Sequence, residues 1–262
     1  MSLDLAITAF THLLALSLVI QTLEGISLSR RNDVKAIWVW SVQKGDLRDT
    51  SRIIQTLFAF LFDDRNHFVH LAIRLCVALS LLIQPYIGAA IFLFISTVIL
   101  SIRWRGAFNG GSDFMTFVTV TGLLIGTSAS LFNDRDMAWN AAFWYITIHS
   151  ISSYFMSGAV KLLNQHWRHG SALTHFLDGG LYGPLTKRSF FRKPMIAKLA
   201  SWGFILWEIS FPLVLFDADF AKVYCVIAFT FHLLVFRFFG LNRFVWAWVG
   251  TFPAILYCAD RF

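Results

Sequence analysis

The segment YIGAAIFLFISTVILSI, residues 86–102, decides the class of fold, because it runs its full length without one charged side chain. About 20 mostly apolar residues, within a range of about 17–25, are enough for a helix to cross a bilayer. The apolar residues are continuous and do not alternate with polar ones, so the segment predicts a helix and not a strand of a barrel.

Seven other segments repeat this character, although the first contains His12 and Gln21 and the second is separated from residues 86–102 only by Pro85. All eight together predict an all-α, multi-pass transmembrane helical bundle in one domain, residues 1–262. The predicted spans are residues 3–23, 67–84, 86–102, 113–131, 139–157, 200–216, 220–237 and 242–258. Residues 37–62 contain a shorter apolar run after a polar patch, and this pattern predicts one or two interfacial helices.

The composition agrees with a membrane protein. Hydrophobic residues make up 57% of the chain, charged residues 14%, and the mean hydropathy is +0.63. Soluble globular domains have about 45–50% apolar and about 25% charged residues. A surface in contact with lipid removes the need for more charge, so we expect the chain to contact membrane lipids along most of its length.

The basic residues are placed as the positive-inside rule requires. They gather in alternate connections, at 24–36, 103–112, 158–199 and 237–243, while the connections between these are poor in Lys and Arg. This pattern explains the net charge of +7 and predicts that these loops are cytoplasmic, so nucleic acid is not an expected partner. The bacterial inner membrane is the expected location, and the sequence does not indicate an oligomeric state.

No cleavable signal peptide is expected, because the N-terminus has no basic region before its apolar run and carries Asp4 instead. The chain has three cysteines, and none forms a CxxC pair: Cys76, Cys225 and Cys258. We interpret all three as small buried apolar side chains, and not as metal ligands or disulfide partners.

Residues 154–178 carry the most informative polar pattern. A helix passes the small residues Ser157, Gly158 and Ala159 and then reaches Lys161. Small residues allow close helix packing, whereas a lysine at the centre of a membrane costs about 2.5–3.5 kcal/mol. Lys161 must therefore extend to the headgroups from a helix end, find an acidic partner, or lose its proton and become a base.

Three other polar residues lie within predicted spans. His232 is either a site residue or a histidine hydrogen-bonded to a neighbouring helix. Glu208 is expected to be paired with Lys161 or His232, because an unpaired carboxylate there would be protonated. His149 is twelve residues before Lys161, about 18 Å along a helix at 1.5 Å per residue, and belongs to another depth.

Several polar residues have simpler interpretations. His166, His169 and His175 lack the recurrent spacing of zinc or di-iron sites even with Asp178 nearby, so no metal is predicted. They are expected to cap a helix and line an aqueous mouth. Ser112 or Asp113 is expected to cap the helix that begins there.

Four motifs in order resemble the HTTM family of membrane proteins, which are related to vitamin K-dependent γ-glutamyl carboxylase. The first motif is Arg105 with Gly110-Gly111-Ser112-Asp113. The second is Tyr154-Phe155-x-x-Gly158-x-x-Lys161-Leu162 with Trp167 and Gly170. The third is Trp202-Gly203 through Glu208-x-x-Phe211-Pro212. The fourth is Phe231-His232 with Phe239-Gly240 and Phe244. The resemblance covers about residues 100–255.

The resemblance implies a carboxylase-like membrane fold in which Lys161 is the base that deprotonates reduced vitamin K or another quinol. Oxygen then forms a stronger base, which removes a proton from a glutamate side chain of a peptide or protein substrate, and carbon dioxide is added. His232 and Glu208 are the other expected catalytic residues. Tyr154, Gly158, Trp167 and His149 are expected to bind the substrate or the cofactor.

Two features differ from the animal carboxylases. The sequence ends near its last predicted span, without their large non-membrane region, and the loop charges place Lys161 near the cytoplasmic side and not the lumenal side. Short bacterial members include proteins resembling membrane factors that mature secreted peptide toxins. The alternative is therefore a non-catalytic factor that binds lipid or helps to mature or export a peptide. A transporter is less favoured because no internal repeat is evident.

Overall fold

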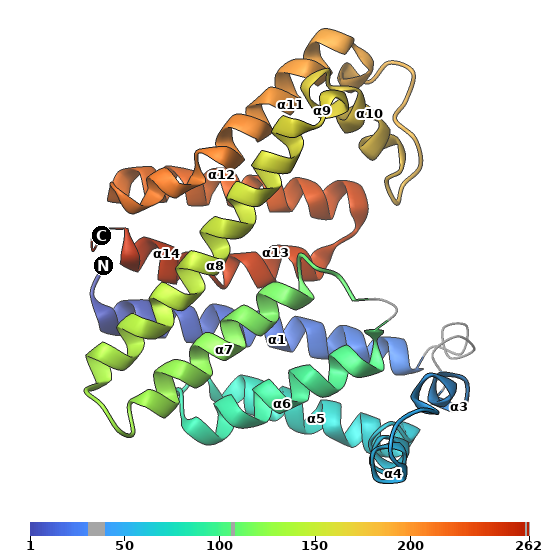
Figure 1. The fold of residues 1–262 in the computed structure, drawn as a ribbon, viewed down its shortest axis with the longest axis vertical. Coiled ribbons are helices and arrows are strands. Elements are labelled where there is room, and N and C mark those ends of the chain that lie inside the picture. The colour runs from blue at the N-terminus through green and yellow to red at the C-terminus, as the bar shows by residue number, and fades with distance from the viewer. Residues whose placement is uncertain (31–39, 106–107, 260, 262) are drawn as a thin grey trace.

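The computed structural model describes residues 1–30, 40–105, 108–259 and 261, and its regular elements in those ranges are all helices (Figure 1). The predicted all-α class is therefore confirmed. In chain order the elements are α1 (Leu3–Arg30), α3 (Trp40–Gln43), the 3-10 helix η1 (Lys44–Leu47), α4 (Arg52–Leu61), α5 (Asp64–Ser80), α6 (Ile87–Arg103), α7 (Asp113–Ala129), α8 (Arg135–Leu163), α9 (Gln165–Arg168), α10 (Ser171–Asp178), η3 (Phe190–Arg192), α11 (Pro194–Ile209), η4 (Phe211–Leu215), α12 (Ala218–Phe239), α13 (Asn242–Val249) and α14 (Phe252–Cys258).

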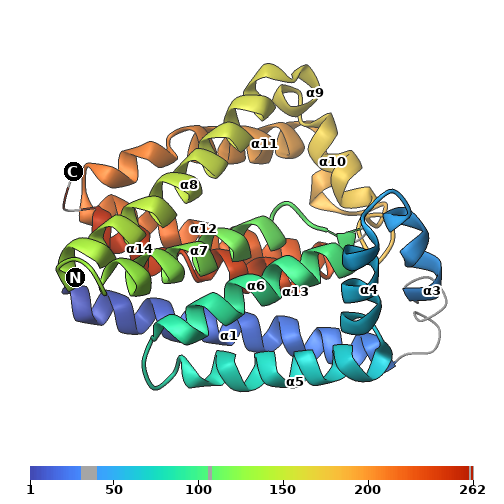
Figure 2. The same cartoon turned by 60° about the horizontal axis from the view of Figure 1, so that its bottom comes forward.

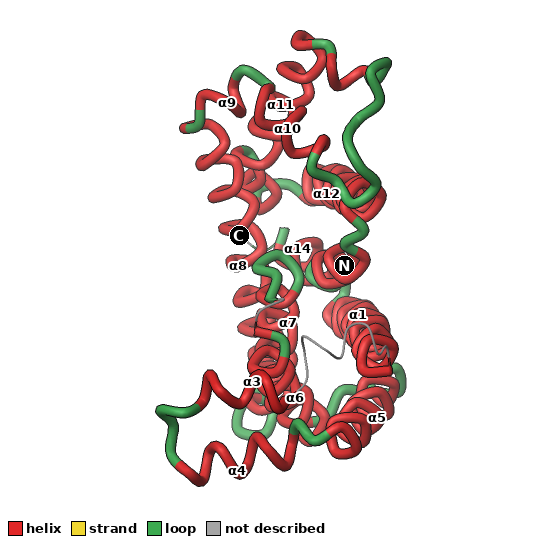
Figure 3. The backbone as a smooth tube through the Cα atoms, turned by 90° about the vertical axis from the view of Figure 1, so that its right-hand side faces the viewer, coloured by secondary structure: helices red, strands yellow, loops and turns green. Residues whose placement is uncertain are grey.

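The long helix α8 joins two groups of helices. It packs against α7 on one side and against α11 and α14 on the other. Helices α1, α5, α6 and α7 form one end of the molecule, and α9, α10 and the start of α11 form the opposite end (Figures 1 and 2). Seen from the side, the molecule is elongated along this direction (Figure 3). In the core, Phe143 packs edge-to-face against Phe10 and at a tilt against Tyr257, with ring centroids 5.7 and 5.2 Å apart.

Local sequence signals set the ends of the longest helices. Asp134 caps α8 by accepting hydrogen bonds from the backbone N–H groups of Asp136 and Met137, and Asp217 caps α12 in the same way. Gly240 ends α12 in the left-handed conformation, with φ +69°. Ser112 makes no side-chain cap at α7, so the predicted cap is wrong. Asp113 instead accepts from the backbone N–H of Asn109 at 2.7 Å.

Two described helices, α1 and α12, are long and apolar enough to cross a membrane, and they support membrane association. The predicted number of eight spans stays a prediction. Prolines break two of the predicted spans. Residues 242–258 form two helices, α13 and α14, and Pro253 lies in the first turn of α14. Residues 200–216 are divided between α11 and η4, and Pro212 lies in the first turn of η4. Proline lacks the N–H of an interior helical bond, and this favours a new helix start.

The region predicted to be interfacial contains α3, η1 and α4, while residues 37–39 of that prediction lie outside the described residues. In α4, Ile53 and Leu57 are exposed, as is Phe60. The basic connection predicted at 24–36 begins later than expected, because α1 continues to Arg30.

Candidate functional site

Lys161 and Glu208 form a buried ion pair between α8 and α11. The Lys161 Nζ atom lies 2.6 Å from Glu208 Oε2 and 2.8 Å from Oε1, and the two side chains are 15% and 2% exposed. The pairing predicted for Glu208 is confirmed, with Lys161 and not His232 as its partner. In a buried pair of this kind, each group is the partner that the other would otherwise find in water.

Ser157 completes the polar group. Lys161 Nζ donates to Ser157 Oγ at 2.5 Å, and Ser157 Oγ donates to Glu208 Oε1 at 3.2 Å. Ser157 and Lys161 are four residues apart, which places them on one face of α8. Ser157 was expected only to be a small residue at a helix contact, although its spacing of four from Lys161 was a signal for this polar role.

Gly158 is the reason that α11 can come so close to α8. A Cβ atom at this position would lie 2.6 Å from the backbone N of Ile209 and 2.9 Å from Cβ of Glu208. Any larger residue must push the two helices apart. Gly158 therefore sets the distance across which Lys161 reaches Glu208, as expected for a small residue at a helix interface.

Trp167 covers the outer side of the pair. Lys161 Nζ lies 5.3 Å from the centroid of the Trp167 ring, within the range of a cation–π contact. The Trp167 carbonyl accepts a hydrogen bond of 2.5 Å from Ser201 Oγ, which joins α9 to α11. Gly170 has φ +82°, and its Cβ would lie 2.6 Å from the carbonyl carbon of Ala197. Both the conformation and the space require glycine there.

Tyr154 and His232 form a second polar pair, deeper in the protein. The Tyr154 hydroxyl and His232 Nε2 are 2.7 Å apart, and the two residues are 3% and 1% exposed. Tyr154 stacks on Phe211 with a centroid distance of 4.0 Å, and Trp248 stacks on His232 at 5.1 Å. Tyr154 is seven residues before Lys161, about 10 Å along α8. His232 therefore faces Tyr154 and not Lys161.

His149 does not join these two pairs. Its ring packs against Tyr145 at 4.5 Å and Phe114 at 6.3 Å, at the middle of α8. Its different depth in a membrane stays a prediction. At the end of α10, Asp178 forms an ion pair of 2.8 Å with Arg192.

The exposed histidines at the end of α8 do not gather around one point. His166, His169 and His175 lie on α9, at its C-cap and on α10. Over the described ranges, no group of three His, Cys, Asp or Glu side chains is arranged to hold a metal ion.

Lys161 lies between a buried carboxylate and an aromatic ring, because Glu208 is 2% exposed and the Trp167 ring centroid is 5.3 Å from Nζ. A quinol would need a base near its hydroxyl and an apolar face beside its ring. Val160 and Leu163, next to Lys161 on α8, are 61% and 82% exposed and present an apolar approach. Four cavities of the described residues lie elsewhere, and none of these four is lined by Lys161, Glu208 or His232.

The remaining residues of the family-like pattern have structural contacts of their own. Arg105 pairs with Asp46 of η1, far from Lys161 in the chain. Gly111 faces the Phe244 ring without room for a side chain. No protein-family model, curated protein or solved structure matches the chain.

Proposed function

We propose that this chain is a multi-pass membrane protein of the HTTM type and that Lys161 acts as a base on a reduced quinone. One observation carries the proposal. Residues of three separate family-like motifs meet between α8, α9, α11 and α12, with Lys161 against Glu208 and Trp167, and Tyr154 against His232.

The protein side of the chemistry is proton transfer at Lys161 Nζ. Glu208 and Ser157 hold this nitrogen in place, and a proton can pass from Nζ to Glu208 Oε2 across 2.6 Å. Neutral Lys161 can then accept a proton from a hydroxyl on its exposed side. A bound quinol would supply that hydroxyl and the reaction with oxygen. The proposed acceptor of the carboxyl group is a glutamate side chain of a peptide or protein substrate.

The test is oxygen-dependent epoxidation of a reduced naphthoquinone by the purified protein in lipid nanodiscs. Lys161→Arg is the central variant, because arginine keeps the positive charge beside Glu208 but does not act as a base. We expect its activity to fall at least a hundredfold while its thermal unfolding midpoint stays within a few degrees of wild type. Lys161→Ala and Glu208→Gln are expected to lose activity as well.

Lys198→Arg is the matched control, because Lys198 is an exposed lysine of α11. It should keep wild-type activity. Full activity in folded Lys161→Arg would remove Lys161 from the chemistry.

A second candidate function is supported by a different observation. Lys161, Ser157 and Glu208 satisfy one another, and none of the described cavities is lined by Lys161 or Glu208. A non-catalytic factor that binds lipid, or helps to mature or export a peptide, would use such a pair to fix its helices. Absence of epoxidation by the folded wild-type protein would favour this function.

A further inference from the structure

Arg74 is a buried cation at the end of the molecule opposite to α9 and α10. It lies on α5, is 1% exposed, and is the largest fully buried side chain in the described ranges. Its Nη1 atom donates to Ser96 Oγ at 2.9 Å, Thr97 Oγ1 at 3.2 Å and the Leu93 carbonyl at 3.4 Å. All of these acceptors are neutral, so none of them balances the charge.

The other edge of the guanidinium has no such bonds. Nε of Arg74 is buried without a hydrogen-bond partner, and every bond that the described residues make to this side chain uses Nη1. The Nε–Nη2 edge presents two parallel N–H groups, the geometry that binds two oxygens of a carboxylate or phosphate at once. A buried arginine without an anion is costly, since guanidinium stays charged at any ordinary pH.

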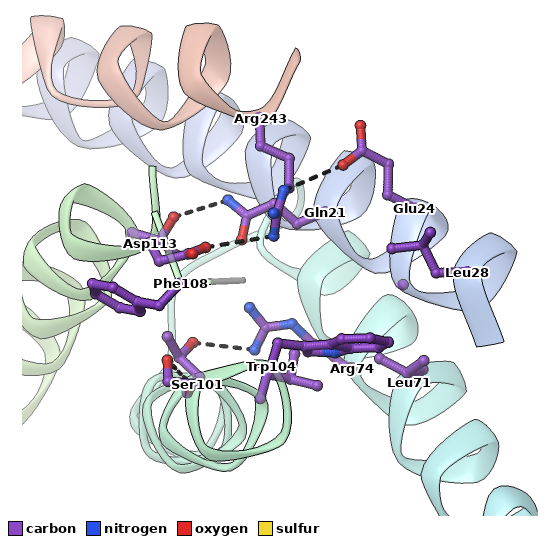
Figure 4. Close-up of a pocket in the computed structure, with 14 residues that line it drawn as sticks. Gln21, Glu24, Leu28, Leu71, Arg74, Ser101, Trp104, Phe108, Asp113 and Arg243 are labelled. Carbon is purple, nitrogen blue, oxygen red and sulfur yellow. Dashed lines mark hydrogen bonds and ion pairs between the residues drawn. The ribbon is translucent and has the colours of Figure 1, made fainter. Parts of the chain in front are cut away.

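Arg74 lines a cavity of about 110 Å³ between α1, α5, α6, α7 and α13. This volume is well above the space that one water molecule needs. In Figure 4 the guanidinium of Arg74 extends beside Trp104 toward the space below Gln21 and Arg243. The wall also contains apolar side chains from four segments: Leu28, Leu71, Leu100 and Phe108.

The acidic residues of this cavity are already held by a different arginine. Arg243 lies 3.4 Å from Glu24 Oε2 through its Nε and 3.5 Å from Asp113 Oδ1 through its Nη1 (Figure 4). In the described ranges, no carboxylate lies within ion-pair distance of Arg74. Arg74 is therefore the arginine of this cavity that has no carboxylate partner, although the wall holds two arginines and two acids.

We propose that this cavity binds the phosphate group of a membrane lipid, held by the Nε–Nη2 edge of Arg74. Phosphate matches the two parallel donors, and the cavity volume of about 110 Å³ admits a headgroup phosphate while the acyl chains stay outside it. The inference rests on the membrane placement in the proposed function, but not on any chemistry at Lys161.

The experiment follows thermal unfolding of the full chain in phosphate-free detergent by tryptophan fluorescence. Three probes separate the sources of binding: dihexanoyl phosphatidic acid, inorganic phosphate, and dihexanoylglycerol, which lacks the phosphate. A ligand that binds only the folded state raises the unfolding midpoint with its concentration. We expect phosphatidic acid to raise the wild-type midpoint saturably and dihexanoylglycerol to leave it unchanged.

Variants identify the residue responsible. Arg74→Lys keeps the charge but loses the two-donor edge, so its half-saturating concentration should rise at least tenfold, and Arg74→Met should show no shift. Arg135→Met is the control, because Arg135 is exposed and paired with Asp4 at 2.8 Å. It should respond as wild type. If Arg74→Met does not fold, Arg74→Lys still decides the result.

Two outcomes support a phosphate site and differ in its source. A shift with phosphatidic acid at far lower concentration than with inorganic phosphate identifies a lipid, and equal half-saturation identifies free phosphate. Three outcomes overturn the proposal: no shift in wild type with either phosphate probe, the same shift with dihexanoylglycerol, or an undiminished shift in both Arg74 variants. Because Lys161 is unchanged in all these proteins, quinol epoxidation can fail or succeed independently.

Discussion

Lys161 and Arg74 are both buried cations on helices of one apolar bundle, but the protein treats them differently. Lys161 has a carboxylate 2.6 Å away on a neighbouring helix, and a glycine that allows that helix to approach. Arg74 has only hydroxyl and carbonyl oxygens, and one of its two-donor edges faces a cavity. Burial alone therefore does not distinguish a cation that holds two helices together from one that is available to an anion.

The largest expected effect comes from breaking the ion pair on one side only. Glu208→Ala or Lys161→Ala should each destabilise the protein by about 3–5 kcal/mol, because the remaining charge stays buried without its partner. The double variant Lys161→Met with Glu208→Leu should recover most of this loss. The measurement is a double-mutant cycle of unfolding free energies in detergent. Additive losses in the cycle would mean that the pair contributes little.

The next effect tests whether Gly158 brings the helices together. Gly158→Ala should cost about 1–3 kcal/mol, because its Cβ overlaps the α11 backbone. Gly203→Ala is the matched control within α11, since nothing lies within 4 Å of its added Cβ. That control should be neutral or stabilising by about 1 kcal/mol, because alanine favours helix. Equal effects of the two substitutions would contradict the close-approach explanation.

A comparable or smaller loss is expected for the deeper pair. Tyr154→Phe removes the hydroxyl bonded to His232 Nε2 and leaves both ring nitrogens of a buried histidine without partners. The cost should be about 1–3 kcal/mol. Tyr182→Phe, at an exposed tyrosine, should change stability very little. Chemical unfolding of both variants checks this, and a neutral Tyr154→Phe would show that the hydroxyl is not needed.

The smallest effect is expected at Arg74 in lipid-free and phosphate-free detergent. Arg74→Met should change the unfolding free energy by no more than about 1 kcal/mol, since removing an unbalanced buried charge offsets the lost hydrogen bonds. Thermal and chemical unfolding under these conditions provide the measurement. A loss as large as that of Lys161→Ala would mean that Arg74 is a structural cation like Lys161, and the contrast between them would disappear.

Much of the fold and part of the site were predictable from local patterns. Continuous apolar runs predicted helices, and the cost of a charge in an apolar span predicted that Glu208 is paired. The break between α13 and α14 was missed because residues 242–258 are apolar on both sides of Pro253. The Tyr154–His232 hydrogen bond was also missed, since 78 residues separate the two side chains in the chain. The spacing of residues within one helix does not predict a contact between two different helices.

Local sequence is enough to specify apolar helices with a few costly polar residues inside them, because hydropathy and helix ends depend on neighbouring residues. Which of these polar residues meet depends on the packing of the helices. Lys161 reaches Glu208 because Gly158 lets α11 approach α8. Arg74 instead meets hydroxyl and carbonyl oxygens of α6, and the two acids of its cavity, Glu24 and Asp113, pair with Arg243. Such meetings depend on how helices pack, and packing is a property of surfaces that are distant in the chain.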